Sequence, residues 1–183
     1  GRGGATSTGA YLLYVCEMLP ARAGRMAKWV ARTEGSSIVL LCHRDGFIPA
    51  FANAGFAQVL LYRNVWHLRR MLRSMPKPKL VHGFAPKSKF PDVARLALQP
   101  QGVPYIHDLQ DTLVVYYGRD VEQRWLREEL PHERACMAGA DGLIAHSLEP
   151  NEGFRRYGIA RKDRPPTLFF PLYCDDDLFV DNV

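Results

Sequence analysis

Residues 11–44 read YLLYVCEMLPARAGRMAKWVARTEGSSIVLLCHR and indicate the fold of this chain. Two apolar runs of strand length, Tyr11–Leu19 and Ser36–Arg44, flank a helical segment, RMAKWVARTE, which Gly35 is expected to end. Both runs are continuously apolar rather than alternating, as is typical of strands in a parallel sheet that is covered on both faces. The stretch therefore predicts a β-α-β unit with parallel strands.

The same alternation continues along the rest of the chain. Further strands are expected in QVLLYR, KLVHGFA, VPYIHDLQD, DGLIAHS and PTLFFPLY. Helices are expected in FIPAFANAG, VWHLRRMLRSM, PDVARLALQ, Arg119–Ala138 and Asn151–Tyr157. Asn64 can cap the helix of residues 65–75, because its side chain can accept from a backbone N–H of the first turn. The pattern predicts an α/β fold: a doubly wound, mostly parallel Rossmann-like sheet of about seven strands with helices on both faces.

The domain organisation follows from where this pattern begins and stops. Residues 1–10 have no apolar run and are expected to form a flexible or processed tail. Residues 11–174 are expected to form one Rossmann-like domain. Residues 175–183 follow the last predicted strand without a closing helix, so we expect them to begin an interdomain linker.

Composition excludes several classes of protein. The chain has 183 residues, 47% of them hydrophobic and 23% charged, which is unlike collagen-like, low-complexity or disordered chains. No apolar run approaches the ~20 residues that a membrane-spanning helix needs. The four cysteines form no CxxC and the six histidines no HExxH, so neither a disulfide framework nor a structural zinc site is expected. Free thiols favour a cytoplasmic location, and no metal is predicted.

Positive charge is concentrated in one part of the chain, although the formal net charge is only +5. The stretch Leu61–Gln101 holds one acid, Asp92, and nine bases: Arg63, Arg69, Arg70, Arg73, Lys77, Lys79, Lys87, Lys89 and Arg95. Such a region attracts anions, whether phosphate, acidic lipid or nucleic acid. No recognised nucleic-acid-binding motif accompanies the charge, so no nucleic-acid partner is expected.

The helix predicted for residues 65–75 has two interpretations. Trp66 lies among Arg69, Arg70 and Arg73, and a basic amphipathic helix with an aromatic side chain can lie on an anionic membrane. Alternatively it is an ordinary outer helix whose apolar stripe packs on the sheet. The sequence leaves both open.

A ligand site in such a fold lies beyond the carboxyl ends of the strands, where the strand order reverses. If the first and fourth strands are neighbours, the loops Pro20–Arg25 and His82–Lys89 line this crevice. The residues that follow the fifth and sixth strands lie at the same edge: Asp108, Gln110, Asp111 and Ser147. In the first loop, backbone N–H groups near Ala23, Gly24 and Arg25 can meet an anion.

Standard nucleotide motifs are absent from the sequence. The first loop is not GxGxxG, and GxxxxGK[ST] does not occur, so neither a classical NAD enzyme nor a P-loop hydrolase is expected. Ser147 lacks the GxSxG context of a hydrolase nucleophile, so it is expected to cap the next helix. Asp175–Asp177 resembles a metal cluster only superficially, and a solvated linker is favoured.

HDLQD, residues 107–111, is the densest chemical cluster. Asp108 and Asp111 can orient a hydroxyl or act as a base, and His107 titrates near neutrality. Equally, strand alternation can turn His107 and Asp108 to opposite faces while the carboxylates cap the next helix. His82 likewise is either a core histidine or a crevice residue.

Four segments together resemble the N-terminal domain of GT-B glycosyltransferases of the retaining, group 1-like type. They are, in order, KLVHGFAPKS, GVPYIHDLQD, GADGLIAHSLEPNEGFRRYGI and PTLFFPLYCDDDLF. The matching segments occur in the family's order and spacing over nearly all of Tyr11–Phe179.

This resemblance implies a glycosyltransferase that moves a sugar from a nucleotide-sugar to a glycan, lipid-linked or small-molecule acceptor, without a cofactor. The N-terminal domain binds the acceptor, while a C-terminal domain with a Glu-x7-Glu motif holds most of the donor. That motif is missing here, so this chain alone is expected to be inactive. The catalytic candidates are Asp111, which matches the family's Asp, then Gln110, where many relatives have His, and His107.

The resemblance also implies binding residues for the acceptor or a phosphate: Ala23, Gly24, Arg25, His82, Lys87 and Ser147. A second hypothesis is non-enzymatic. In it, the chain is a stand-alone α/β module that binds an anionic ligand or the inner membrane surface through Leu61–Gln101.

Overall fold

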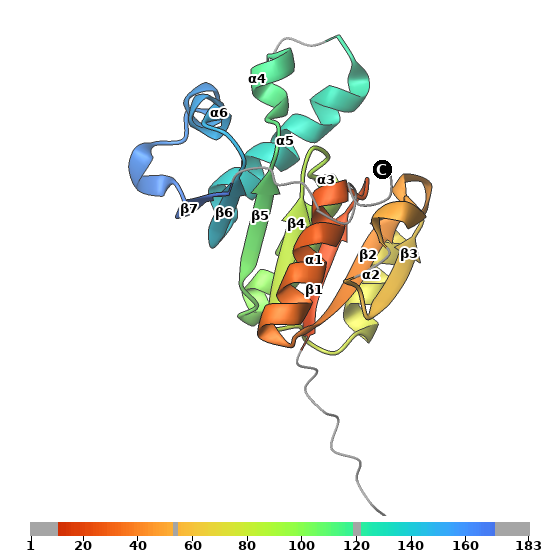
Figure 1. The fold of residues 1–183 in the computed structure, drawn as a ribbon. Helices are drawn as coiled ribbons and strands as arrows, with labels where there is room; N and C mark the ends of the chain where they lie inside the picture. Colours follow the sequence, from red (N-terminus) through yellow and green to blue (C-terminus); the bar gives the residue numbers. More distant parts are fainter. Residues whose placement is uncertain (1–10, 53–54, 119–121, 171–183) are drawn as a thin grey trace, which may run out of the picture.

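The structure is a computed structural model that describes residues 11–52, 55–118 and 122–170. Within these residues seven strands form one sheet (Figure 1): β1 (Tyr11–Cys16), β2 (Ser37–His43), β3 (Gln58–Tyr62), β4 (Leu80–Phe84), β5 (Tyr105–Leu109), β6 (Gly142–Ala145) and β7 (Thr167–Phe169). The predicted tail, the predicted linker, Cys174 and Asp175–Asp177 lie outside the described residues.

The strand order is β3-β2-β1-β4-β5-β6-β7, and every neighbouring pair is parallel. The order reverses between β1 and β4, where Leu12 pairs with Leu80 and Val15 with Gly83. The predicted α/β Rossmann-like fold is therefore confirmed, with its switch point at the β1–β4 junction.

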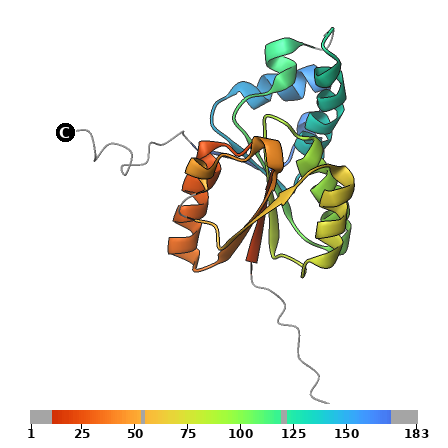
Figure 2. The same ribbon diagram turned by 90° about the vertical axis from the view of Figure 1, so that its right-hand side faces the viewer.

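Helices cover the two faces unequally. They are α1 (Ala21–Glu34), α2 (Val65–Ser74), α3 (Lys89–Leu98), α4 (Leu113–Tyr117), α5 (Arg124–Gly139) and α6 (Glu149–Tyr157). Helix α1 packs on one face through a cluster that includes Ala23, Met26 and Ala27. Helices α2, α3 and α5 lie on the other face over a larger core, so the sheet stands between two helical layers (Figure 2).

Several element boundaries differ from the prediction, and three differences concern the edge where a site is expected or the helices near it. Helix α1 begins at Ala21, so most of the predicted first loop is helical. In the segment predicted as a helix at residues 47–55, the described residues form a 3-10 turn, Pro49–Phe51, and no α-helix. Helix α4 was not predicted, because its sequence, LVVYY, is rich in β-branched and aromatic residues that are poor helix formers.

Predicted end signals are confirmed at two helices. Asn64 Oδ1 accepts from the backbone N–H of His67 at 2.9 Å and caps α2. Gly35 ends α1 with φ 60°, a left-handed conformation that glycine adopts without a Cβ penalty. The three described cysteines, Cys16, Cys42 and Cys136, are buried free thiols.

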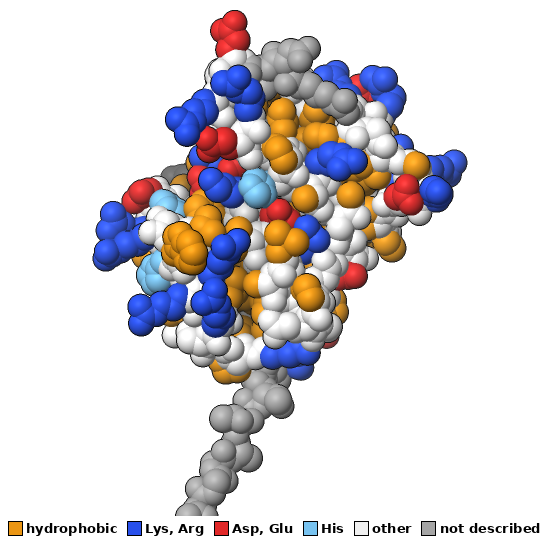
Figure 3. All heavy atoms as spheres, turned by 180° about the vertical axis from the view of Figure 1, so that it is seen from behind, with side chains coloured by type: hydrophobic (Ala, Val, Ile, Leu, Met, Phe, Trp, Pro, Cys, Tyr) orange, Lys and Arg blue, Asp and Glu red, His pale blue; other side chains and the backbone are white. Residues whose placement is uncertain are grey.

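Helix α2 presents its basic face to solvent. Leu68 and Leu72 are buried against the sheet, whereas Trp66 is 75% exposed. Arg69, Arg70 and Arg73 are also exposed, and Lys and Arg side chains gather on the side of the molecule where α2 lies, at the left of Figure 3. No helix in the described part of the chain is long and apolar enough to span a bilayer.

Candidate functional site

Arg22 joins three of the loops at the carboxyl edge of the sheet. It lies in the first turn of α1 and is only 4% exposed. Its Nε donates to Asp108 Oδ1 at 2.6 Å, while its two terminal nitrogens donate to Gln110 Oε1 at 2.6 Å and to the carbonyl oxygen of Ala85 at 2.9 Å. One guanidinium therefore fixes the start of α1 against the ends of β4 and β5.

Asp108 is the buried partner of this cation. It is fully buried, and His146 Nε2, which follows β6, lies 3.2 Å from its Oδ2. The other ring nitrogen of His146 lies 2.7 Å from the carbonyl oxygen of Phe170. Burial raises the pKa of Asp108, but the hydrogen bond from His146 and the charge of Arg22 outweigh it, so this pKa lies below its ordinary value. The carboxylate of Asp108 thus links the end of β5 to the start of α1 and to the residue after β6.

His82 is buried beside the same carboxylate. Its ring stacks on Phe84 with centroids 4.2 Å apart, and its Nε2 lies 3.9 Å from Asp108 Oδ2 without a hydrogen bond to any described residue. Burial, together with the positive charge of Arg22, lowers the pKa of His82 to about 4. His82 is therefore a buried, neutral histidine beside Asp108 that lines neither pocket described below, and its predicted acceptor contact stays a prediction.

His107 faces the opposite side of the sheet from Asp108, as strand alternation predicted. It is fully buried, with Tyr105 Oη 2.8 Å from Nδ1 and Ser88 Oγ 3.3 Å from Nε2. Burial lowers its pKa to about 3. The side chain of His107 is therefore enclosed in the core and is not exposed at the carboxyl edge of the sheet.

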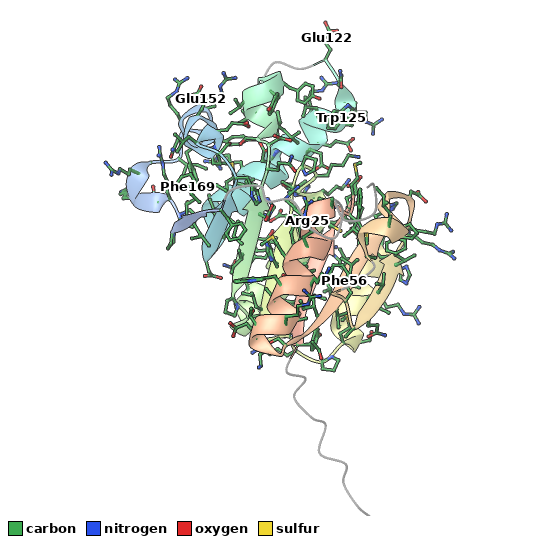
Figure 4. The ribbon with its side chains drawn as sticks, viewed as in Figure 1. Arg25, Phe56, Glu122, Trp125, Glu152 and Phe169 are labelled. Carbon is green, nitrogen blue, oxygen red and sulfur yellow. The ribbon has the colours of Figure 1, made fainter. Side chains whose placement is uncertain are left out.

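An open pocket of about 440 Å³ lies next to the Arg22 cluster. It is lined by Met18, Pro86, Lys87, Asp111, Leu113, Tyr116, Tyr117 and Trp125. These residues follow β1, β4 and β5 or belong to α4 and α5, so the pocket occupies the edge where ligands of open α/β sheets bind. Figure 4 shows Trp125 on α5 above this edge, with Arg25 near the upper end of α1.

The pocket combines aromatic surface with a few charges. Tyr117 packs edge-on against Trp125 with ring centroids 5.9 Å apart, and Tyr116 is 64% exposed. Lys87 Nζ lies 2.7 Å from Glu17 Oε1 and 5.9 Å from the centroid of the Trp125 ring. The negative charges of Asp111 and Glu149 raise the pKa of Tyr116. Such a wall suits a ligand with a flat apolar face and polar substituents.

The structure distributes the predicted site residues unevenly. Asp111 and Lys87 line the pocket, and Gln110 binds Arg22 beside it. Ala23 and Gly24 are buried in α1, where a Cβ on Gly24 would overlap with the backbone carbonyl of Phe51. Arg25 is half-buried on the same helix.

Ser147 lies apart from the pocket. It is exposed after β6, and its Oγ accepts from the backbone N–H of Glu149 at 3.2 Å. The N-cap residue of α6 is Leu148, which makes no side-chain cap, so Ser147 is not the N-cap that the sequence predicted. With His146 and Phe169, Ser147 lines a smaller pocket of about 240 Å³. Trp66 and the α2 arginines are on the outer face and do not line either pocket.

Capping of the helix after β5 is not done by the HDLQD carboxylates. The backbone N–H groups of Leu113 and Val114 bind Glu133 of α5 instead. That alternative for Asp108 is therefore wrong, because Asp108 is already engaged by Arg22 and His146.

Sequence reasoning missed Arg22 and the aromatic wall. Arg22 directly precedes Ala23, Gly24 and Arg25, the contacts predicted for the first loop. The signal for its role was an arginine at the start of a helix on the same sheet edge as Asp108. Tyr116 and Tyr117 gave no periodic signal, since α4 is one short turn, and Trp125 lies at the start of the separate helix α5. Within the residues that the structure describes, no group of three or more His, Cys, Asp or Glu side chains could hold a metal ion.

A parallel sheet whose strand order reverses beside a pocket at the carboxyl ends of its strands defines a Rossmann-like α/β domain. The family model described as "Glycosyl transferase 4-like domain" matches residues 19–165. The chain therefore belongs to the glycosyl transferase 4-like domain family.

Solved structures show the same fold. Arabidopsis thaliana UGT89C1 complexed with UDP-L-rhamnose is 13% identical, with a TM-score of 0.51 over 90% of this chain and 50% of that one. The same protein complexed with UDP is also 13% identical, with a TM-score of 0.49 over 93% and 55% of the two chains. This chain thus spans about half the length of these structures, and the likeness supports the fold alone. No curated protein matches the chain.

Proposed function

We propose that this chain is the acceptor-side, N-terminal domain of a retaining GT-B glycosyltransferase, which moves a sugar from a nucleotide-sugar to a glycan, lipid-linked or small-molecule acceptor. The observation that carries the proposal is the aromatic pocket at the carboxyl edge of the sheet, with Asp111 and Lys87 in its wall. Membership of the glycosyl transferase 4-like family supports it.

In this proposal the pocket holds and orients the acceptor. Tyr117 and Trp125 cover its apolar face, and the Asp111 carboxylate accepts a hydrogen bond from the hydroxyl that is to be glycosylated. Gln110, held by Arg22, precedes Asp111 in the chain and does not itself line the pocket. The domain would contribute chiefly by fixing the attacking oxygen, since well-oriented reactants gain several kcal/mol of the barrier.

The donor is proposed to be a nucleotide-sugar held mainly by a second domain. The structural neighbours are complexes with UDP and UDP-L-rhamnose, and this chain covers about half of them. The nucleotide-sugar is a substrate, so no cofactor is proposed. A cytoplasmic site of action, where such donors are made available, fits the three buried free thiols.

Asp111→Asn tests the proposal in the protein that carries this chain. The substitution keeps the shape of the side chain and removes its charge, so turnover should fall at least about a hundredfold, as for loss of one oriented catalytic group. Asp45→Asn, on the exposed turn after β2, is the matched control. Unchanged kcat in Asp111→Asn would overturn the assigned role.

A second candidate is a module that binds an anionic membrane surface. The favouring observation is α2, where exposed Trp66 stands among three exposed arginines. Calorimetric titration with a panel of nucleotide-sugars tests the first candidate, the divided transferase. Binding by the longer protein only supports the divided transferase, whereas tight binding by this chain alone would contradict the division of labour.

A further inference from the structure

Helix α4 forms one wall of the pocket but has little stability of its own. Its five residues are LVVYY, and isolated helices of this length are unstable in water. Thr112, its N-cap residue, makes no side-chain cap, and its buried Oγ1 has no hydrogen-bond partner among the described residues. The position of α4 must therefore come from tertiary contacts.

Two carboxylates from other helices hold its N-terminal end. Glu133 of α5 is fully buried and accepts from Leu113 N at 2.6 Å and from Val114 N at 3.1 Å. Glu149 of α6 accepts from Thr112 N at 2.6 Å. Three successive backbone donors that the short helix leaves open are thus bound by carboxylates.

One guanidinium holds the carbonyl groups of the same helix. Arg156 of α6 donates through one terminal nitrogen to the carbonyl oxygens of Val114 at 3.1 Å and Val115 at 3.3 Å. Its Nε binds Glu152 Oε1 at 2.8 Å, which fixes the direction of the side chain. The hydroxyl of Tyr157, the next residue on α6, donates to Glu133 at 2.5 Å.

We propose that Glu133 and Arg156 are positioning residues of the pocket: by holding α4 from α5 and α6, they set the distance of Tyr116 and Tyr117 from Trp125 and so determine which acceptor fits. Neither residue lines the pocket. The role in acceptor choice rests on the proposed function, whereas the hold on α4 does not.

Hydrogen–deuterium exchange of residues 113–118 measures the hold directly. Arg156→Ala should speed exchange there about tenfold, because losing the equivalent of roughly one hydrogen bond lowers the free energy of local opening. Exchange in β5 should stay slow. Arg155→Ala is the matched control, because Arg155 also binds Glu152 but does not reach α4. Arg156→Lys should restore part of the protection, since an ammonium can still donate to a carbonyl.

Glu133→Gln tests the other contact with little change in volume. Burial raises the pKa of Glu133 to about 7 against the hydrogen bonds that lower it, so exchange is best compared at pH 8, where the wild-type side chain is mainly ionised. The amide retains one acceptor for two backbone donors, and exchange at Val114 should rise severalfold. Glu128→Gln, on the exposed side of α5, is the control.

Acceptor kinetics test the consequence for the pocket. In the active protein, Arg156→Ala should raise the acceptor KM severalfold, with kcat and donor KM nearly unchanged. Equal exchange in Arg155→Ala and Arg156→Ala would overturn the hold on α4. Faster exchange in Arg156→Ala with an unaltered acceptor KM would instead overturn the assignment of this pocket to the acceptor, and with it the specificity role, while the hold on α4 would stand.

Discussion

At the residue scale, the arrangement of the carboxyl edge depends on one buried ion pair. Arg22 and Asp108 are 4% and 0% exposed, and their charged groups meet at 2.6 Å. Removing one partner of such a pair leaves the other charge buried without compensation, which costs far more than the intact pair contributes. The stability of the site is therefore concentrated in residues that do not touch the pocket.

Arg22→Met should lower the free energy of unfolding by about 3–5 kcal/mol, because Asp108 then keeps only its histidine neighbours. Urea unfolding followed by circular dichroism measures this change. Arg44→Met, which removes an exposed pair with Asp45, should cost less than about 1 kcal/mol. Similar losses in the two variants would contradict the central role of Arg22.

His82 should make stability depend on pH. Its pKa is lowered to about 4 in the folded state, whereas an unfolded histidine titrates near 6.5. The folded state therefore binds the proton less readily, and the contribution of His82 is fully present above pH 6.5 and is lost as the pH falls toward 4. The loss is on the order of 3 kcal/mol. The difference in unfolding free energy between wild type and His82→Gln should change by this amount between pH 7.5 and 4, and parallel curves would refute it.

At the scale of elements, the start of α1 depends on its close approach to the turn Pro49–Phe51. Gly24 is buried there, and no side chain fits between the helix and the backbone of Phe51. The absence of a side chain at Gly24 therefore allows the helix to pack closely against this turn. A phosphate contact by its backbone would need that turn to move away.

Gly24→Ala should destabilise the protein by about 1–3 kcal/mol although alanine is the better helix former, because overpacking forces the backbone apart. Thermal unfolding of the variant measures the effect. Arg32→Ala, on the exposed end of α1, should leave the melting temperature nearly unchanged. A stabilised Gly24→Ala would show that the approach to Phe51 is not tight.

The seven strands and most helices were predictable from the sequence, whereas the short helix α4 was not. The strands β1, β2 and β4 were predicted from continuous apolar runs, and α2 from its periodicity and the Asn64 cap. Helix α4 was missed because Glu133 and Arg156, distant in the sequence, supply the contacts that its own residues lack.

At the scale of the whole molecule, helix α2 adds positive charge to the surface and has no acidic residue of its own. Asp92, the one acid of Leu61–Gln101, is 3% exposed and binds Arg95 and His132. The exposed charge on α2 is therefore all positive, on the side opposite to α1 (Figure 3). This asymmetry suits peripheral contact with an anionic membrane.

Vesicle sedimentation with and without acidic phospholipid tests that contact. Each basic residue near such a surface contributes about 1 kcal/mol, so neutralising Arg69, Arg70 and Arg73 together with glutamine should weaken binding roughly a hundredfold. Replacing exposed Arg161 and Lys162 with glutamine should have little effect. Equal binding by the two variants would leave α2 as an ordinary outer helix.

The sequence alone determined the fold class, because the alternation of apolar runs with helical segments is a local property that survives without tertiary information. It also placed Asp111 and Lys87 at the carboxyl edge, since the ends of parallel strands share one edge. Only the tertiary structure decided that Arg22, Asp108 and His146 meet and that α4 forms a pocket wall with Trp125. The contacts of Arg22, Asp108 and His146 join residues about 40 to 90 positions apart, and α4 is too short to give a periodic signal in the sequence. Both arrangements are selected by tertiary packing rather than by local propensity.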